Sequence, residues 1–248
     1  RTYLKTVGAA AGTAVAAGCL DGGDENVINP GTAPGFPPFE FTEDGELVGF
    51  DVDLAEEAIE RAGYEVGEWT EVEFDSLIPS LTEGNIDLIA AAMTITDDRA
   101  EQLAFSDAYY ESDQAVLIRD DGELELESTD DLDGLRVGAQ SGTTGRDQVL
   151  ELIDDGVVDE DDFRQYDNYT LAVDDLESGN VDALVIDIPV ARNFADSRAV
   201  EIAFIIETGE EFGLGMRLDD DRIADINDAL AEMQDDGTYD DLVEQWFE

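Results

Sequence analysis

The sequence predicts an α/β protein in which mainly parallel sheets are flanked by helices, and three observations carry this prediction. Short apolar strands alternate with amphipathic helices from residue 27 onward. An apolar run after Gly84 ends at Thr96-Asp97-Asp98, which has the residues of a helix start. The junction Leu81 to Ile89, a helix end followed by glycine and a strand, is echoed by Leu176 to Leu184. Two similar α/β units are therefore expected.

The individual elements follow from periodicity and from turn residues. The expected strands and hairpin arms cover residues 27–29, 39–41, 47–50, 66–72, 85–92, 135–139 and 181–187. The expected helices cover residues 51–61, 74–83, 147–153, 222–235 and 239–247.

The charge of the chain is extreme. Its 248 residues include 64 acidic and 12 basic side chains, a formal net charge of -52, and the only lysine is Lys5. Such self-repulsion opposes folding in dilute buffer, but at about 1 M salt the Debye length is only roughly 3 Å. Because the acids are spread through periodic segments, the composition is typical of a halophile's globular protein. The length allows one large domain or two ordinary ones.

Several classes of site are disfavoured by the composition. A polyanionic nucleic acid would be repelled, and no basic stripe exists, so no nucleic-acid partner is expected. The chain has no histidine and a single cysteine, Cys19, which leaves no internal disulfide and no cysteine-rich metal site. The acidic pairs lack the spacing of a calcium loop. No metal and no cofactor are expected.

The first 19 residues have the order of an export signal: basic residues, then an apolar stretch, then small residues. The end of this segment, Ala16-Ala17-Gly18-Cys19, resembles a lipobox, which would make Cys19 a lipid anchor. A lone buried cysteine is the alternative. Residues 20–26 are expected to be a flexible linker.

Two charged residues lie near the ends of the two similar segments, Arg99 in the first copy and Asp187 in the second. Arg99 lies at the strand-to-helix corner of the first copy, where a guanidinium is placed to bind a carboxylate or phosphate. A simple ion pair with Asp97 or Asp98 is the alternative. In the second copy Asp187 takes the position of Ala92, so the two strand ends would offer a cation and an anion to a zwitterion. The glycine-rich loop Gln140 to Gly145 precedes a helix and suits a carboxylate rather than a nucleotide.

Five groups of residues, taken together, resemble a known family. They are Pro38 to Phe41, Gly49 to Leu54, Thr94 to Arg99, Phe105 to Asp107 with Tyr109-Tyr110, and Gly237 to Tyr239 with Trp246-Phe247. The chain resembles the extracellular solute-binding proteins of ABC transporters for polar amino acids, the group that contains the glutamine-, histidine- and lysine/arginine/ornithine-binding proteins. The resemblance covers residue 27 to the end.

The resemblance implies a two-lobed periplasmic-binding-protein fold that closes on its ligand by a hinge motion. Lobe 1 would contain residues 27–110 and 212–248, and lobe 2 residues 111–211. Two hinge segments would cross between the lobes, near residues 109–113 and 208–212.

The resemblance also implies a ligand site. Arg99 would bind the α-carboxylate, helped by Thr94 and by the backbone of Ala91 and Ala92, and Asp187 would bind the α-ammonium group. The remaining matches are loop contacts in lobe 2 and aromatic walls: Gln140, Thr143, Phe36 and Phe74.

Two positions depart from the family pattern. Ala33 stands where relatives have an aspartate that binds the ligand side chain. Ile186 replaces a histidine that lies beside the ammonium-binding acid in the glutamine-type protein. Both changes disfavour a lysine- or arginine-like ligand and favour one with a neutral side chain, aliphatic ones included, with glutamine or an acidic amino acid left open.

The expected function is that of a haloarchaeal-type lipoprotein on the extracellular face of the cell membrane, which captures a free amino acid and delivers it to the membrane permease of an ABC transporter. An enzyme resembling arogenate or prephenate dehydratase, with Asp187 or Glu40 as its acid, is the main alternative. A sensory input domain is the third.

Overall fold

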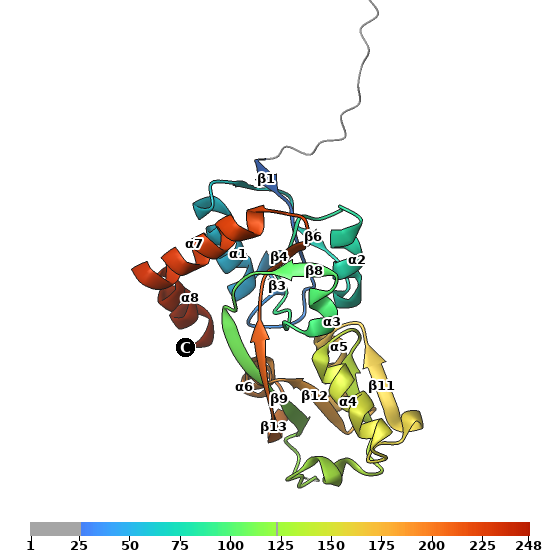
Figure 1. Cartoon of the computed structure of the whole chain (residues 1–248). Helices are drawn as coiled ribbons and strands as arrows, with labels where there is room; N and C mark the ends of the chain where they lie inside the picture. Colours follow the sequence, from blue (N-terminus) through green and yellow to red (C-terminus); the bar gives the residue numbers. More distant parts are fainter. Residues whose placement is uncertain (1–25, 123) are drawn as a thin grey trace, which may run out of the picture.

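The computed structural model describes residues 26–122 and 124–248, and it has two lobes, each built on a five-stranded sheet (Figure 1). The predicted two-lobed α/β fold is confirmed. The predicted export signal and its Cys19 lie outside the described residues, as does most of the predicted linker.

Lobe 1 contains the sheet nearer the N-terminus. In sheet order its strands are β6 (Thr70–Glu71), β2 (Pro30–Thr32), β7 (Leu88–Ile89), β14 (Gly215–Arg217) and β8 (Leu103–Phe105). Its helices are α1 (Phe50–Arg61), η1 (Phe74–Ser76), α2 (Leu77–Thr82), α3 (Asp97–Ala100), α7 (Arg222–Asp236) and α8 (Thr238–Phe247). Two strand pairs complete the lobe: β1 (Val27–Ile28) with β5 (Glu65–Val66), and β3 (Phe41–Glu43) with β4 (Glu46–Val48).

Lobe 2 contains the second sheet. In sheet order its strands are β11 (Phe163–Tyr166), β10 (Val137–Gln140), β12 (Ala183–Asp187), β9 (Tyr110–Arg119) and β13 (Val200–Phe212). Its helices are η2 (Thr129–Leu132), α4 (Thr144–Asp154), η3 (Glu160–Asp162), α5 (Tyr169–Glu177) and α6 (Ile188–Ser197).

Both sheets are mixed, whereas the sequence predicted mainly parallel ones. Two strand pairs in each sheet are parallel and two are antiparallel. The antiparallel pairs arise because β14 runs opposite to both β7 and β8, and β9 runs opposite to both β12 and β13. Another difference concerns residues 66–72, where two short strands replace the predicted one, since β5 pairs with β1 and β6 with β2.

The internal echo marks equivalent places in the two lobes. Gly84 and Gly179 both adopt left-handed backbone angles, with φ of 79° and 73°, where a helix ends before the central strand. Those strands, β7 and β12, each have a parallel neighbour on one side and an antiparallel neighbour on the other. Asp87 and Asp182 also match, because each accepts a hydrogen bond from the backbone at the start of the neighbouring parallel strand. The prediction of two similar units is confirmed.

The long strands β9 and β13 run between the lobes (Figure 1). Their lobe-1 ends pair antiparallel, with Tyr110 opposite Phe212 and Ser112 opposite Glu210. The pairing is irregular between Ile206 and Glu210. The two predicted crossing segments therefore lie side by side, and rotation about this ribbon would change the separation of the lobes.

Candidate functional site

A pocket lies between the two lobes. It encloses about 290 Å³, part of which is open to solvent, and six of its lining residues belong to lobe 1 and four to lobe 2. Eight of the ten residues predicted for the ligand site line it: Phe36, Phe74, Ala92, Thr94, Arg99, Gln140, Thr143 and Asp187. Only about 10 Å³ of this space can hold the centre of a water-sized molecule, so the closed lobes leave little free room at the site.

Arg99 is placed by the short helix α3, whose cap residue Thr96 accepts a hydrogen bond from the Arg99 backbone. The guanidinium is buried and donates to two carbonyl oxygens, Thr94 O at 2.7 Å and Gly142 O at 3.0 Å. Burial lowers the pKa of Arg99 from its usual value, yet an arginine stays charged at neutral pH. Of its five N–H groups two are used in these bonds, which leaves three for an anion in the pocket.

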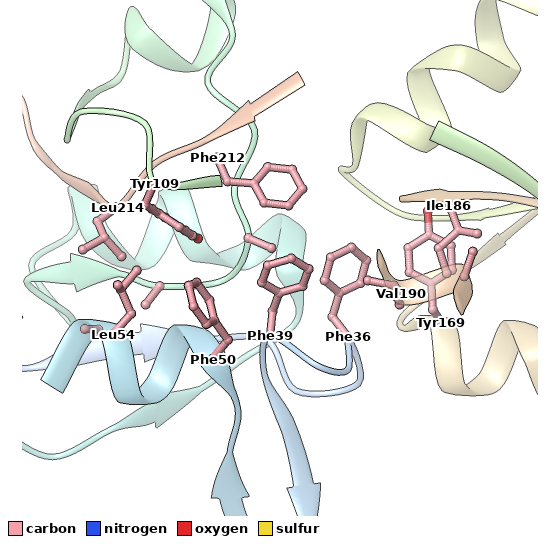
Figure 2. Close-up of a cluster of buried hydrophobic side chains, with 14 of the residues drawn as sticks. Phe36, Phe39, Phe50, Leu54, Tyr109, Tyr169, Ile186, Val190, Phe212 and Leu214 are labelled. Carbon is pink, nitrogen blue, oxygen red and sulfur yellow. The ribbon is translucent and has the colours of Figure 1, made fainter. Parts of the chain in front are cut away.

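The bond from Arg99 to Gly142 joins the two lobes, and two further contacts do the same. The Thr94 and Thr144 hydroxyl oxygens are 3.3 Å apart. The ring of Phe36 lies 5.6 Å from that of Tyr169, and Figure 2 shows Phe36 reaching from the lobe-1 aromatic cluster toward Tyr169. The cleft is therefore closed in this structure.

The second predicted aromatic wall, Phe74, supports the arginine. The guanidinium carbon of Arg99 lies 5.4 Å from the centre of the Phe74 ring, a distance at which the ring attracts a cation. Phe74 thus contributes to the pocket wall and fixes the direction of the Arg99 side chain.

Asp187 ends β12 on the lobe-2 side of the pocket and is only 3% exposed. Burial, with a smaller contribution from the Glu210 carboxylate, raises the pKa of Asp187 to about 8. Its Oδ1 atom has no hydrogen-bond partner among the described residues. An ammonium group that reached this oxygen would stabilise the ionised form.

The loop before α4 supplies the other lobe-2 contacts. The Thr143 hydroxyl caps α4, because it accepts from the Arg146 backbone and donates to the Gln140 carbonyl. The hydroxyl is thus committed within the loop. Gln140 faces the pocket with an Oε1 atom that has no partner in the described part of the chain.

Ala92 has a left-handed backbone conformation, with φ of 43°, which is unusual for a residue other than glycine. The buried carboxylate of Asp51 holds it there. Its Oδ2 atom accepts from the Ala92 backbone N–H at 2.6 Å and from the Tyr109 hydroxyl at 2.7 Å. Burial raises the pKa of Asp51 to about 7, opposed by these two bonds.

Two predicted residues do not line the pocket. Ala91 is buried in the lobe-1 core beside Ile89. Ala33 lines a neighbouring, more open cavity with Phe74, Gln140 and other residues of both lobes. Ile186, which the sequence placed beside the ammonium-binding acid, is fully buried in the core cluster of Figure 2.

Sequence reasoning missed Thr144 and Glu210, and it named Glu40 only as an acid of the alternative enzyme. Glu40 and Thr144 line the pocket, and Glu210 accepts hydrogen bonds from Thr94 and Thr144. Glu40 is 1% exposed, and burial, followed by the Asp51 and Asp187 carboxylates, raises its pKa well above the usual value. The polar residue between Phe39 and Phe41 was the available signal for Glu40, since alternation turns it away from its aromatic neighbours.

Within residues 26–122 and 124–248, no group of three or more acidic, histidine or cysteine side chains is arranged to hold a metal ion. No helix in the same residues is long and apolar enough to cross a membrane.

Comparison with known proteins places this geometry in a family. The model of the bacterial extracellular solute-binding proteins, family 3, matches residues 28–248. A probable histidine-binding protein of Campylobacter jejuni is 34% identical over 223 residues, which cover 88% of this chain and 84% of the relative. The arginine-binding extracellular protein ArtP of Bacillus subtilis is 34% identical over 222 residues, with the same coverage.

Solved structures of amino-acid-binding proteins are similar to this chain over most of its length. An ancestral arginine-binding protein bound to arginine superposes with a TM-score of 0.84 at 38% identity, covering 90% of this chain and 99% of the other. An ancestral amino-acid-binding protein described as a precursor of cyclohexadienyl dehydratase superposes with a TM-score of 0.81 at 32% identity, covering 90% and 96%. The chain belongs to the bacterial extracellular solute-binding proteins of family 3.

Proposed function

We propose that this protein is the substrate-binding component of an ABC transporter and captures a free L-amino acid between its two lobes. The observation that supports this proposal best is that one pocket contains a buried cation from lobe 1, Arg99, and a buried acid from lobe 2, Asp187. Arg99 binds the α-carboxylate, with three N–H groups to donate, and Asp187 accepts from the α-ammonium group. The proposed lobes are residues 27–110 with 212–248, and residues 111–211.

The preferred ligand has a neutral side chain. The resemblance implies that relatives have polar side chains at the positions of Ala33 and Ile186, and neither residue supplies one: Ala33 lines the neighbouring cavity and Ile186 lies in the core. The two ancestral arginine-binding structures, one bound to arginine and one to glutamine, make these two amino acids the first alternatives to test. A thermal-shift screen of the common amino acids in high salt identifies the ligand, because binding to the folded state alone raises the melting temperature.

The proposal extends to the location of the protein. Cys19 carries the lipid anchor on the extracellular face of the cell membrane, and the partner is a membrane permease. The protein is a receptor with no catalytic role. Mass spectrometry of the protein purified from its native membrane tests the anchor, since a diacylglyceryl group on Cys19 gives a defined mass increase.

An enzyme on the same fold is the second candidate. One structural neighbour is a precursor of a dehydratase, and Glu40 is a buried acid that lines the pocket. A proton donor of this type is what the departure of the hydroxyl group as water requires when arogenate or prephenate loses water together with carbon dioxide. Incubation with each compound, followed by detection of phenylalanine or phenylpyruvate, decides between the two functions.

The first prediction concerns Arg99. We expect Arg99→Ala to weaken amino-acid binding by about 3 to 5 kcal/mol, because the substitution leaves the ligand carboxylate buried without a partner. Titration calorimetry in molar salt measures the change. Arg146→Ala is the control, since Arg146 lies on the lobe surface and pairs with Asp147. A loss below about tenfold for Arg99→Ala contradicts the assignment.

A further inference from the structure

Glu210 lies on the crossing strand β13 and is only 9% exposed. Its carboxylate accepts hydrogen bonds from three side chains. Thr94 and Thr144 each donate to Oε2 at 2.7 Å, and Gln114 donates to Oε1 at 3.0 Å. Their sequence separations from Glu210 are 116, 66 and 96 residues, so the cluster exists only in the folded molecule.

The three donors come from different parts of the molecule. Thr94 belongs to the lobe-1 loop before α3, Thr144 is the first residue of the lobe-2 helix α4, and Gln114 lies on the crossing strand β9. One oxygen of Glu210 is therefore one of the points at which lobe 1 and lobe 2 meet. Moving the lobes apart would remove at least one of the two threonines from this oxygen.

The Thr94 hydroxyl can donate only one hydrogen bond. A threonine hydroxyl has one proton, and here that proton is given to Glu210. The same proton is not available for the carboxylate of a ligand bound at Arg99. The predicted help of Thr94 to Arg99 would then act through Glu210.

We propose that Glu210 is a positioning residue for amino-acid binding, which holds Thr94 and Thr144 on one oxygen and thereby stabilises the closed arrangement of the lobes around the ligand. The inference rests on the proposed function. It assigns the effect to hydrogen bonding, because Glu210 makes no ion pair with Arg99, whose two bonds go to carbonyl oxygens. A neutral carbonyl oxygen could accept both threonine protons equally well.

Two variants separate hydrogen bonding from charge. Glu210→Gln keeps an acceptor oxygen for the threonines. Its amide can donate to Gln114 Oε1 once the Gln114 amide turns over, because Gln114 Nε2 faces Glu210 Oε1 in this structure. Glu210→Met has a similar size and no strong acceptor. We expect the Gln variant to keep the wild-type closure and the Met variant to lose it.

Double electron–electron resonance between two spin labels measures the separation of the lobes. The labels are attached at Leu218→Cys in lobe 1 and Leu171→Cys in lobe 2, and every variant also carries Cys19→Ser so that no other cysteine is labelled. Both leucines are exposed, by 60% and 48%. In the full chain in molar salt, the Met variant is expected to shift the distances to longer values, while the Gln variant keeps the wild-type distribution. Identical distributions in the wild type and the Met variant overturn the proposal.

Binding kinetics provide a second readout. Stopped-flow measurements with L-arginine and L-glutamine are expected to show dissociation from the Met variant at least about tenfold faster, with association changed by less than about threefold, since closure affects mainly the lifetime of a complex. A Gln variant as impaired as the Met variant overturns the hydrogen-bonding assignment. If no amino acid binds the wild type, the proposed function fails, but the distance measurement still tests the role of Glu210.

Discussion

At the scale of the residue, Asp187 combines deep burial with a neighbouring carboxylate, and both favour its protonated form. Its pKa of about 8 means that the acid holds a proton at pH 7 until a cation reaches it. Pairing with an α-ammonium group requires the ionised form. Binding should therefore release this proton, and a complex that holds fewer protons than the free protein becomes tighter as the pH rises.

We expect amino-acid affinity to increase between pH 6 and pH 8, by at most about tenfold per pH unit, and to level off above pH 8, where Asp187 is ionised in both states. Calorimetry in buffers of different ionisation enthalpy should count nearly one proton released at pH 6 to 7. Asp187→Asn should remove this release. If the variant keeps it, another group, such as Glu40 or Asp51, is its source.

Sequence reasoning found Arg99 and Asp187 because Asp187 ends an apolar run and Arg99 follows one at a helix start, signals contained in a few neighbouring residues. Glu210 gave no such signal. It is one acid in the run Glu207 to Glu211 of a chain rich in acids, and only the pairing of β13 with β9 turns it toward Thr94 and Thr144. Contacts between distant segments decide which acid of such a chain is functional.

At the scale of the element, most helices were predictable and the strand after Gly84 was not. The apolar run from Ile86 to Met93 predicted a long strand, but β7 contains only Leu88 and Ile89. The chain then leaves the sheet, since Asp51 binds the Ala92 backbone and holds it in the left-handed conformation. A tertiary hydrogen bond thus overrides the local preference and shapes the pocket wall.

The loop between β10 and α4 has an equally specific requirement at Gly142. A β-carbon there would lie 2.9 Å from the Asp75 β-carbon and 3.1 Å from its α-carbon, on the opposite lobe. We expect Gly142→Ala to hinder closure and to weaken binding of every ligand at least about tenfold, or about 1.4 kcal/mol. Titration calorimetry measures the change.

Gly156→Ala is the matched control for this substitution. Gly156 has a similar left-handed φ, 75° against 78°, but no atom lies near its missing β-carbon. Both variants carry the same backbone strain, so only the Gly142 variant should lose affinity. Equal losses would assign the effect to strain instead of to the contact between the lobes.

At the scale of the whole molecule, the net charge of -52 acts against compactness. The arginines of the described chain are mostly engaged already, for example Arg198 with Asp174 and Glu177, and Arg136 with Asp182. They leave a large excess of acid that only dissolved cations can screen.

We therefore expect the protein to loosen on dialysis from molar salt into dilute buffer, with loss of near-ultraviolet circular dichroism and a lower melting temperature. Restoring the salt should restore both signals. A spectrum and a melting temperature that stay constant over this range would contradict the interpretation of the composition as halophilic.

The contacts that close the cleft, from Arg99 to Gly142 and from Thr94 and Thr144 to Glu210, are made by the protein with itself. Their contribution to binding is the same for every amino acid in the pocket. They raise affinity without creating selectivity, which is a difference between ligands. The ligand preference of this receptor could thus change in evolution through pocket residues such as Glu40, while the closing contacts stayed as they are.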